Sequence, residues 1–259
     1  MKKFYFSLVV AFMAMTTVAS AQFVQSETTT QQPKSTTGNV FSSMTTDDYN
    51  RIYVGYNPSK ITWSEYQSEC EECYPLKHGI TVGYLHGSNI VKNLPLYIEW
   101  GANFQYLFGK EEYRENGYDY YYKETVKMNI YSLNIPVNLA FRFSFKDNNI
   151  SLTPYMGLNF RVNVAGNIKY EGVEEGLYDD DEWDEEYNIF SKDEEDGFGD
   201  EALKRFQVGF NVGVNFSYKA FNIGVGYVTD FSKIANWNDG GEKLNGKLGV
   251  TTLSLGINF

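Results

Sequence analysis

The feature that most constrains this chain is a strict alternation of apolar and small polar residues over residues 206–218. In FQVGFNVGVNFSY, apolar residues from Phe206 to Tyr218 occupy every second position, and Gln, Gly, Asn and Ser fill the others. Successive side chains of a β-strand point to opposite faces. The segment therefore predicts a strand whose two faces meet two different solvents.

The same alternation recurs in seven other segments of the chain. They lie at about 50–57, 77–87, 94–108, 125–145, 150–165, 221–231 and 247–259. Several reach the about 9–11 residues that a tilted strand needs to cross a bilayer. Eight is an even number, as in single-chain bacterial outer-membrane barrels. We therefore predict an all-β fold over residues 49–259: a transmembrane, antiparallel, up-and-down β-barrel of eight strands.

The strand charges that can be assigned to a face fall on the one that carries Gly, Asn and Ser. They are Arg51, Glu99, Arg142, Arg161 and Asp230. A Lys or Arg that faces lipid at mid-bilayer costs about 2–4 kcal/mol, so the charged face must be the lumen. We expect Glu99 to lie near Arg142 and Arg161 near Asp230. The interior of an eight-stranded barrel is only wide enough for side chains to fill, which favours a polar plug over a proton or ion path.

The N-terminal segment predicts export. Residues 1–21 carry Lys2 and Lys3, then an apolar stretch, then Ala19-Ser20-Ala21, the pattern of a signal peptide. Residues 22–48 are rich in Thr, Ser and Gln and predict a flexible periplasmic leader. Removing the two lysines takes the net charge from −11 to −13, which argues against nucleic acid as a partner.

The connections between the predicted strands alternate in length. Long ones are expected at about 58–76, 109–124, 166–204 and 232–246, with short turns between them. Outer-membrane barrels have short periplasmic turns and long extracellular loops. We therefore expect an outer-membrane protein with both termini in the periplasm.

Four segments resemble a known family. LNIPVNLAFRF (133–143), ISLTPYMGLNF (150–160), FQVGFNVGVNF (206–216) and the closing LSLGINF are similar to the small outer-membrane β-barrel proteins of Bacteroidota, often called PorT-like. The resemblance spans about residues 49–259. It implies contact with outer-membrane lipids. It also implies that the terminal Phe259 belongs to the signal that the barrel assembly machinery reads.

The third long connection is strongly acidic, and the first holds two cysteines. Ca²⁺ is held by several carboxylate oxygens. These could come from Asp179, Asp180, Asp181, Glu182 and Asp184. The spacing does not match an EF-hand, so a solvated acidic loop, with no cofactor, is favoured. Cys70 and Cys73 would face an oxidising compartment, which favours a small loop-closing disulfide over a metal or redox site.

The only two histidines, His78 and His86, fall on the outward register of one predicted strand. A lipid-hydrolysing barrel would need a histidine beside a nucleophilic serine and an orienting group. No motif ties such partners to His78, so interfacial histidines are favoured and no catalytic residue is expected.

Three functions follow from this interpretation. The leading one is a non-enzymatic scaffold that binds a surface partner, such as another protein, through its acidic extracellular loops. A narrow, porin-like pore or small-ligand carrier is the second, and a lipid A modifying enzyme is the third. Fold alone does not decide among them.

Overall fold

The computed structural model describes residues 47–63, 74–91, 94–118, 120–145, 149–176, 180–193, 197, 202–239 and 242–259. The predicted signal peptide, nearly all of the predicted leader, and both cysteines lie outside these ranges. Contacts divide the chain into Met1–Asn39 and Val40–Phe259, and every described residue belongs to the second unit. No helix with the length and hydropathy of a membrane span occurs in the ranges that the structure describes.

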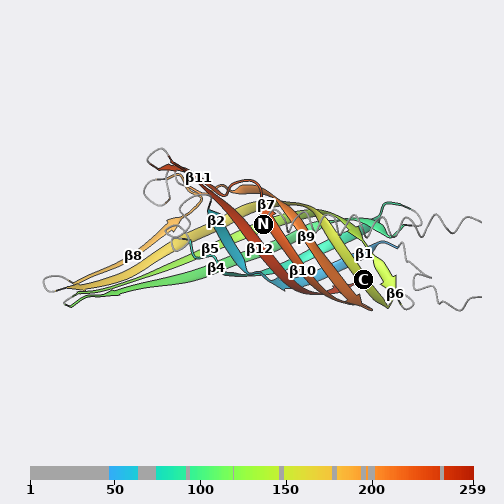
Figure 1. The fold of residues 1–259 in the computed structure, drawn as a ribbon, viewed down its shortest axis with the longest axis horizontal. Helices are drawn as coiled ribbons and strands as arrows, with labels where there is room; N and C mark the ends of the chain where they lie inside the picture. The colour runs from blue at the N-terminus through green and yellow to red at the C-terminus, as the bar shows by residue number, and fades with distance from the viewer. Residues whose placement is uncertain are drawn as a thin grey trace, which may run out of the picture. The chain divides into compact units, whose positions relative to one another are not determined.

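Eight antiparallel strands form a closed ring (Figure 1). They are β1 (Tyr49–Tyr56), β3 (His78–Asn89), β4 (Leu96–Asn116), β5 (Tyr120–Phe141), β7 (Ile150–Gly176), β9 (Phe206–Tyr218), β10 (Phe221–Asp230) and β12 (Glu242–Asn258). Each strand pairs with its neighbour in this order, and β1 pairs with β12 to close the ring. The predicted eight-stranded up-and-down barrel is confirmed, and each predicted strand corresponds to one strand of the ring.

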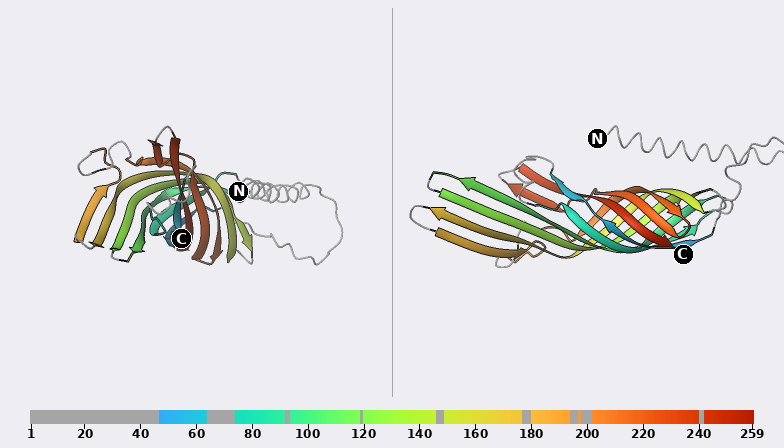
Figure 2. Two further views of the ribbon diagram at one scale, coloured as in Figure 1. Left: turned by 60° about the vertical axis from the view of Figure 1, so that its left-hand side comes forward. Right: turned by 90° about the horizontal axis from the view of Figure 1, so that it is seen from below.

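Four further strands attach to the ring. β2 (Ser59–Trp63) and β11 (Ala235–Asp239) pair with β12, whereas β6 (Phe143–Phe145) and β8 (Asp180–Asn188) pair with β7. The described parts of the segments expected to be loops are therefore largely strands. β4, β5 and β7 continue beyond the ring and, together with β8, form a projecting sheet, which we call the extension (Figure 2). The sequence prediction ended these strands too early, because their charged residues suggested loops.

The two ends of the barrel differ. The end opposite the extension, here the turn end, holds the short connections between strands and the C-terminal Phe259. The tightest connection is Lys219–Ala220 between β9 and β10, where Lys219 has a φ of 53°. Two-residue hairpins favour positive φ because it matches the twist of the strands, although a non-glycine residue is uncommon there.

The polarity of the wall inverts along the barrel. In the half near the turn end, the outward side chains are large and apolar, as shown by exposed fractions of 60% for Leu255 and 56% for Ile223. The inward side chains there are mainly Asn, Ser and Thr. In the other half, the inward positions become apolar. On β12, for instance, buried Leu248 and Val250 follow the same inward register as Thr252 and Ser254. The apolar outer band is the surface that meets lipid, because water would not solvate it.

A β-bulge marks this inversion on one side of the ring. The register of β5 against β7 shifts between Tyr131 and Ser132, so that Ser132 pairs with Asn163 and Tyr131 with Ala165. The extra residue, Val164, changes which side chains of β7 point inward. Asn163 is buried below the bulge and Ile168 above it. Bulges insert one unpaired residue in this way and increase the local twist.

Candidate functional site

The middle of the lumen is built around one buried ion pair. Nη1 of Arg161 on β7 lies 2.6 Å from Oδ2 of Asp230 on β10, and both side chains are almost fully buried. Nε of Arg161 donates to Oδ1 of Asn134 at 3.1 Å. Asn134 also accepts from Asn159 and donates to Asn103, both at 3.1 Å. The structure thus places Arg161 and Asp230 together, inside a network of asparagine side chains.

A second cluster lies nearer the turn end, around Glu99. Oε1 of Glu99 accepts a hydrogen bond from the hydroxyl of Tyr49 and lies 3.8 Å from Nη1 of Arg51. Nε of Arg51 donates to Oδ1 of Asn258 at 2.9 Å. The expected neighbour of Glu99, Arg142, instead places its guanidinium 4.8 Å from the centre of the Tyr49 ring. Arg51 is therefore the cation that pairs with Glu99, and Tyr49 separates it from Arg142.

One small cavity connects the two clusters. It has a volume of about 80 Å³, and its lining includes Arg51, Glu99, Gln105 and Arg161. Oε2 of Glu99 and Oε1 of Gln105 are buried without a protein partner. A polar cavity of this size has room for a few water molecules, which can satisfy such acceptors.

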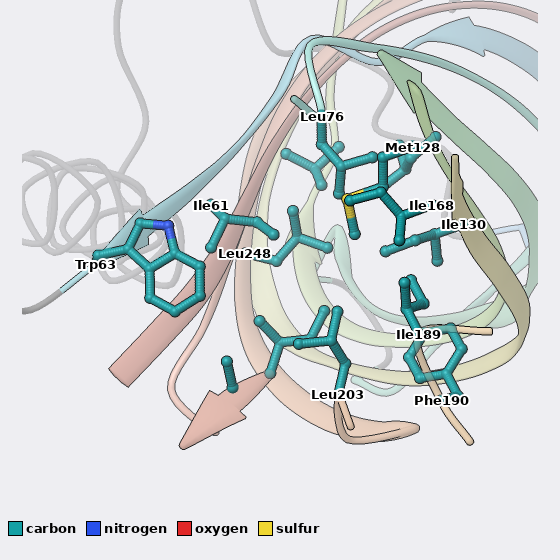
Figure 3. Close-up of a cluster of buried hydrophobic side chains, with 14 of the residues drawn as sticks. Ile61, Trp63, Leu76, Met128, Ile130, Ile168, Ile189, Phe190, Leu203 and Leu248 are labelled. Atoms are coloured by element: carbon teal, nitrogen blue, oxygen red, sulfur yellow. The ribbon is translucent and has the colours of Figure 1, made fainter. Parts of the chain in front are cut away.

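The lumen is closed towards the extension by a hydrophobic plug (Figure 3). Its members are Ile61, Trp63, Leu76, Leu107, Val126, Met128, Ile130, Ile168, Ile189, Phe190, Leu203, Ile234, Ala235, Leu248 and Val250. The strands of the wall contribute one part. The remainder comes from connections, including Leu76 before β3, Ile189 and Phe190 after β8, and Leu203 before β9. The alternation of the strands predicted only a polar plug. The signal that it missed is the change from Ser and Asn to Ile and Met at inward positions of β5.

The face of the extension that continues the inside of the barrel is aromatic and acidic. Tyr122 lies 5.7 Å from Trp183 and 6.1 Å from Tyr113, between ring centres, and Tyr170 lies 6.3 Å from Tyr187. The strand register puts six carboxylates on this inner face: Glu111, Glu115, Glu124, Glu174, Asp181 and Glu185. Burial and the neighbouring Glu124 carboxylate raise the pKa of Tyr122 to about 12. Among the described residues in the extension part of these four strands, no lysine or arginine lies on the inner face, although Lys77, which precedes β3, pairs with Glu111.

The outer face of the extension carries all five basic residues in the extension part of these strands: Lys110, Arg114, Lys123, Lys127 and Lys169. Four of these five residues form ion pairs with carboxylates of the same face. Nζ of Lys127 lies 2.6 Å from Glu171, and Nζ of Lys169 lies 3.0 Å from Glu171 and 2.9 Å from Asp184. Hydrogen bonds from Lys127 and Lys169 lower the pKa of the Glu171 carboxyl to about 2. Hydrogen bonds from Lys110 and Arg114 likewise lower the pKa of Glu112.

The residues proposed for a divalent cation are spread along β8 rather than gathered. Asp181 lies on the inner face of the extension, whereas Asp180, Glu182 and Asp184 lie on the outer face. Asp179 is outside the described residues. Within the described part of the chain, no three acidic, histidine or cysteine side chains form a group that could hold a metal ion. The calcium site, like the disulfide between Cys70 and Cys73, stays a prediction.

Both histidines have side-chain partners that the sequence pattern did not indicate. Nδ1 of His78 lies 2.5 Å from the hydroxyl of Tyr56. His86 lies between two polar side chains, with Nδ1 2.9 Å from Oδ1 of Asn50 and Nε2 2.8 Å from Oγ of Ser88. The sequence signal was the His-x-Ser spacing, which places both side chains on one face of a strand. The contact with Asn50 depends on the register between β1 and β3, which cannot be predicted from the alternation within either strand.

Several solved structures are similar to the chain in backbone arrangement. Ail, the attachment invasion locus protein of Yersinia pestis, is 14% identical, with 82% of this chain and 99% of that chain covered and a TM-score of 0.35. Neisserial surface protein A is 12% identical, with 82% and 97% covered and a TM-score of 0.36. A major outer membrane protein from Thermus thermophilus is 11% identical, with 82% and 100% covered and a TM-score of 0.33.

The family follows from the sequence. No curated protein matches the chain. The model of the outer membrane protein beta-barrel domain matches residues 35–236, which is most of the chain and includes seven of the eight ring strands. The match agrees with the closed ring and its apolar outer band, and it places the protein in the outer membrane. The chain belongs to the outer membrane protein beta-barrel domain family.

Proposed function

We propose that this outer-membrane barrel is a closed scaffold whose extension binds a partner at the cell surface. In this proposal the extension points away from the cell and the turn end faces the periplasm. The predicted signal peptide exports the chain, and the C-terminal Phe259 contributes to its recognition by the barrel assembly machinery. The role requires binding but no catalysis.

The observation that carries the proposal is the filled lumen. The buried pair of Arg161 and Asp230 and its asparagine partners occupy the middle of the barrel. The hydrophobic plug closes the side towards the extension. A conducting pore needs a continuous wet path, and an eight-stranded barrel has little room beside its side chains. The filled lumen therefore favours a scaffold over the pore or carrier, and it leaves the extension as the working part.

The inner face of the extension indicates what the partner looks like. Acid and aromatic residues alternate along β8 as Asp181, Trp183, Glu185 and Tyr187, all on this face. Residues two apart on a strand are separated by about 6.6–6.8 Å, which is also the spacing of alternate side chains in an extended peptide. Lysine and arginine bind both carboxylates and aromatic rings. The face therefore fits an extended segment of another protein with a basic residue at every second position.

Two measurements test the proposal. The purified barrel, inserted in planar bilayers, should show no conductance above the baseline, and steady channels would exclude the closed scaffold. A fluorescent peptide with lysine at alternate positions should bind to the barrel in nanodiscs. A peptide with glutamate in place of lysine should not bind.

A pair of matched variants locates the binding face. Asp181→Asn with Glu185→Gln removes two charges from the inner face of β8, and Glu182→Gln with Glu186→Gln removes two from the outer face. The inner-face variant should weaken peptide binding by roughly five- to tenfold, as expected when two exposed ion pairs are lost. The outer-face variant should change binding less than about twofold. Equal losses would mean that only the net charge attracts the peptide, and would refute binding at the inner face.

A further inference from the structure

Three polar side chains form a chain of hydrogen bonds on the outside of the barrel, near the turn end. Asn50 on β1 and His86 on β3 are directly paired in the sheet, and Ser88 follows His86 by two residues on the same face. Nδ1 of His86 lies 2.9 Å from Oδ1 of Asn50, and Nε2 of His86 lies 2.8 Å from Oγ of Ser88. The register of two strands thus brings together a hydroxyl, an imidazole and an amide.

The chemistry of the three side chains determines which atom donates and which accepts in each hydrogen bond. Oδ1 of Asn50 can only accept, and it also accepts from the hydroxyl of Tyr84 at 2.6 Å. Nδ1 of His86 must therefore carry the proton. In the neutral ring Nε2 is then a free acceptor, so Ser88 donates its hydroxyl proton to it. A second acceptor, Oδ2 of Asp48, lies further from Ser88 Oγ, at 3.4 Å.

This is the arrangement that activates a serine as a nucleophile. A base accepts the hydroxyl proton, and a third group fixes the tautomer and orientation of the base. We propose that Ser88, His86 and Asn50 form a hydrolase triad that removes acyl chains from glycerophospholipids. The inference goes beyond the proposed scaffold and does not depend on it.

The surroundings of the triad indicate the substrate class. The trio lies in the lipid-facing surface, next to Tyr84 and Trp100, which are 42% and 53% exposed, and near exposed Ile90. Tyrosine and tryptophan are enriched where a membrane meets water. The ester bonds of a phospholipid lie at this depth, between the headgroup and the acyl chains. In the orientation proposed above, the triad faces the periplasmic leaflet.

The reaction uses water as its only co-substrate. Oγ of Ser88 attacks the ester carbonyl while Nε2 of His86 takes the hydroxyl proton. The tetrahedral intermediate collapses, the ester C–O bond breaks, and His86 gives its proton to the departing lysophospholipid oxygen. Water then attacks the acyl-serine, His86 takes a proton from the water and returns it to Oγ, and a fatty acid leaves. Asn50 holds the imidazole through Nδ1 and is a positioning residue.

The turnover should be slow. Within the described part of the chain, no hydrogen bond of the trio supplies a donor to the developing oxyanion, and one such donor is usually worth about 10²–10³ in kcat. The carboxylate of Asp48 can stabilise the imidazolium that forms, but it also opposes negative charge near Ser88. Covalent labelling of the serine is therefore a more sensitive test than turnover.

The experiment treats the protein in phospholipid nanodiscs with a fluorophosphonate probe and maps the modified residue by mass spectrometry. We expect Ser88 to be labelled, and fatty acid to be released slowly from the nanodisc lipids. Ser88→Ala and His86→Gln should lose both signals. Asn50→Ala should slow labelling by about tenfold or more, and Asn50→Asp, which keeps the acceptor, should restore most of the rate.

His78→Ala is the matched control, because His78 faces outward at the other end of β3 and contacts Tyr56 rather than a serine. It should label like the unaltered protein. Migration of unboiled samples on gels confirms that each variant is folded. If Ser88 is not labelled, or is labelled equally in folded His86→Gln, the triad is refuted. Neither result would affect the two tests of the proposed scaffold, which are the lack of conductance and the binding of a peptide by the extension.

Discussion

The two halves of the barrel are built from the same strands but in opposite senses. Near the turn end, β5 presents Leu133 and Ile135 to the outside and Asn134 to the lumen. Further along the same strand, it buries Met128 inside and presents Lys127 outside. The first half is arranged for lipid around it, and the second is arranged for water, like a soluble β-protein. The comparison indicates that the membrane surface lies where the polarity of the wall inverts. Beyond that point the outer side chains face water, and the inward side chains form an apolar core.

The largest expected effect comes from the ion pair that lies in the polar half. Asp230→Ala leaves the buried Arg161 without its partner and should reduce the free energy of unfolding by about 3–5 kcal/mol. Urea unfolding in detergent micelles measures the loss. Arg161→Met combined with Asp230→Leu should recover much of it, since no charge is then left unpaired. In the water-exposed half, Glu112→Gln removes the partner of Lys110 and should change little, because that pair is solvated. Similar losses for both would contradict the comparison.

Two leucines on opposite faces of β12 test the apolar plug. Leu248 is fully buried in the plug, and Leu255 is 60% exposed on the lipid-facing surface. Leu248→Ala should cost about 2–5 kcal/mol, because it leaves a cavity as well as losing transfer free energy. Leu255→Ala should cost about 1–2 kcal/mol, because lipid fills the vacated space and only the transfer term remains. Urea titrations of both variants decide the matter, and an equal cost would mean that the plug is loosely packed.

The sequence predicted the lipid-facing half of the fold well and the other half poorly, for a physical reason. Where lipid lies outside, apolar residues must alternate with polar ones, so FQVGFNVGVNF identifies β9 without ambiguity. Beyond the membrane, both faces of a strand accept charge. The segments GKEEYREN of β4 and YYYKET of β5 therefore suggested loops although they form the extension.

The candidate sites divide in the same way. The lumen charges followed from alternation alone, because a charge on the lipid face is costly. The proximity of Arg161 and Asp230 was predicted too, but the partner of Glu99 was not, since the contact between Arg51 and Glu99 depends on how strands are staggered around the ring. The trio of Asn50, His86 and Ser88 was missed for the same reason. The alignment of β1 with β3 is a property of pairing between strands, which a single strand's pattern does not contain.

A scan of arginine substitutions along the outer face of β5 would locate the membrane surface. Leu133→Arg places a charge in the lipid-facing band and should cost about 2–4 kcal/mol. Asn129→Arg, four residues away on the same face, lies beyond the inversion and should cost less than about 0.5 kcal/mol, as surface substitutions usually do. Reversible unfolding in phospholipid vesicles is the measurement. Should Asn129→Arg cost as much as Leu133→Arg, the membrane would extend further along the barrel than the polarity of the wall indicates.

The smallest effect concerns pH and is confined to the extension. Lys127 and Lys169 lower the pKa of Glu171 to about 2, from an ordinary value of 4.5. A carboxyl with a lowered pKa in the folded state stabilises that state above its unfolded pKa, and the contribution disappears as the pH falls through the folded pKa. The free energy of unfolding of the extension should therefore decrease as the pH falls from about 4.5 to about 2. Carboxyl NMR titration of Glu171 would measure its pKa, and hydrogen exchange across β5 and β7 would measure the stability of the extension.

Lys127→Met with Lys169→Met should return the titration of Glu171 towards pH 4.5 and remove this part of the pH dependence. If Glu171 titrates in the double variant as it does in the unaltered protein, the two lysines do not form ion pairs with Glu171 in solution. Ion pairing would then not be the difference between the outer and inner faces of the extension.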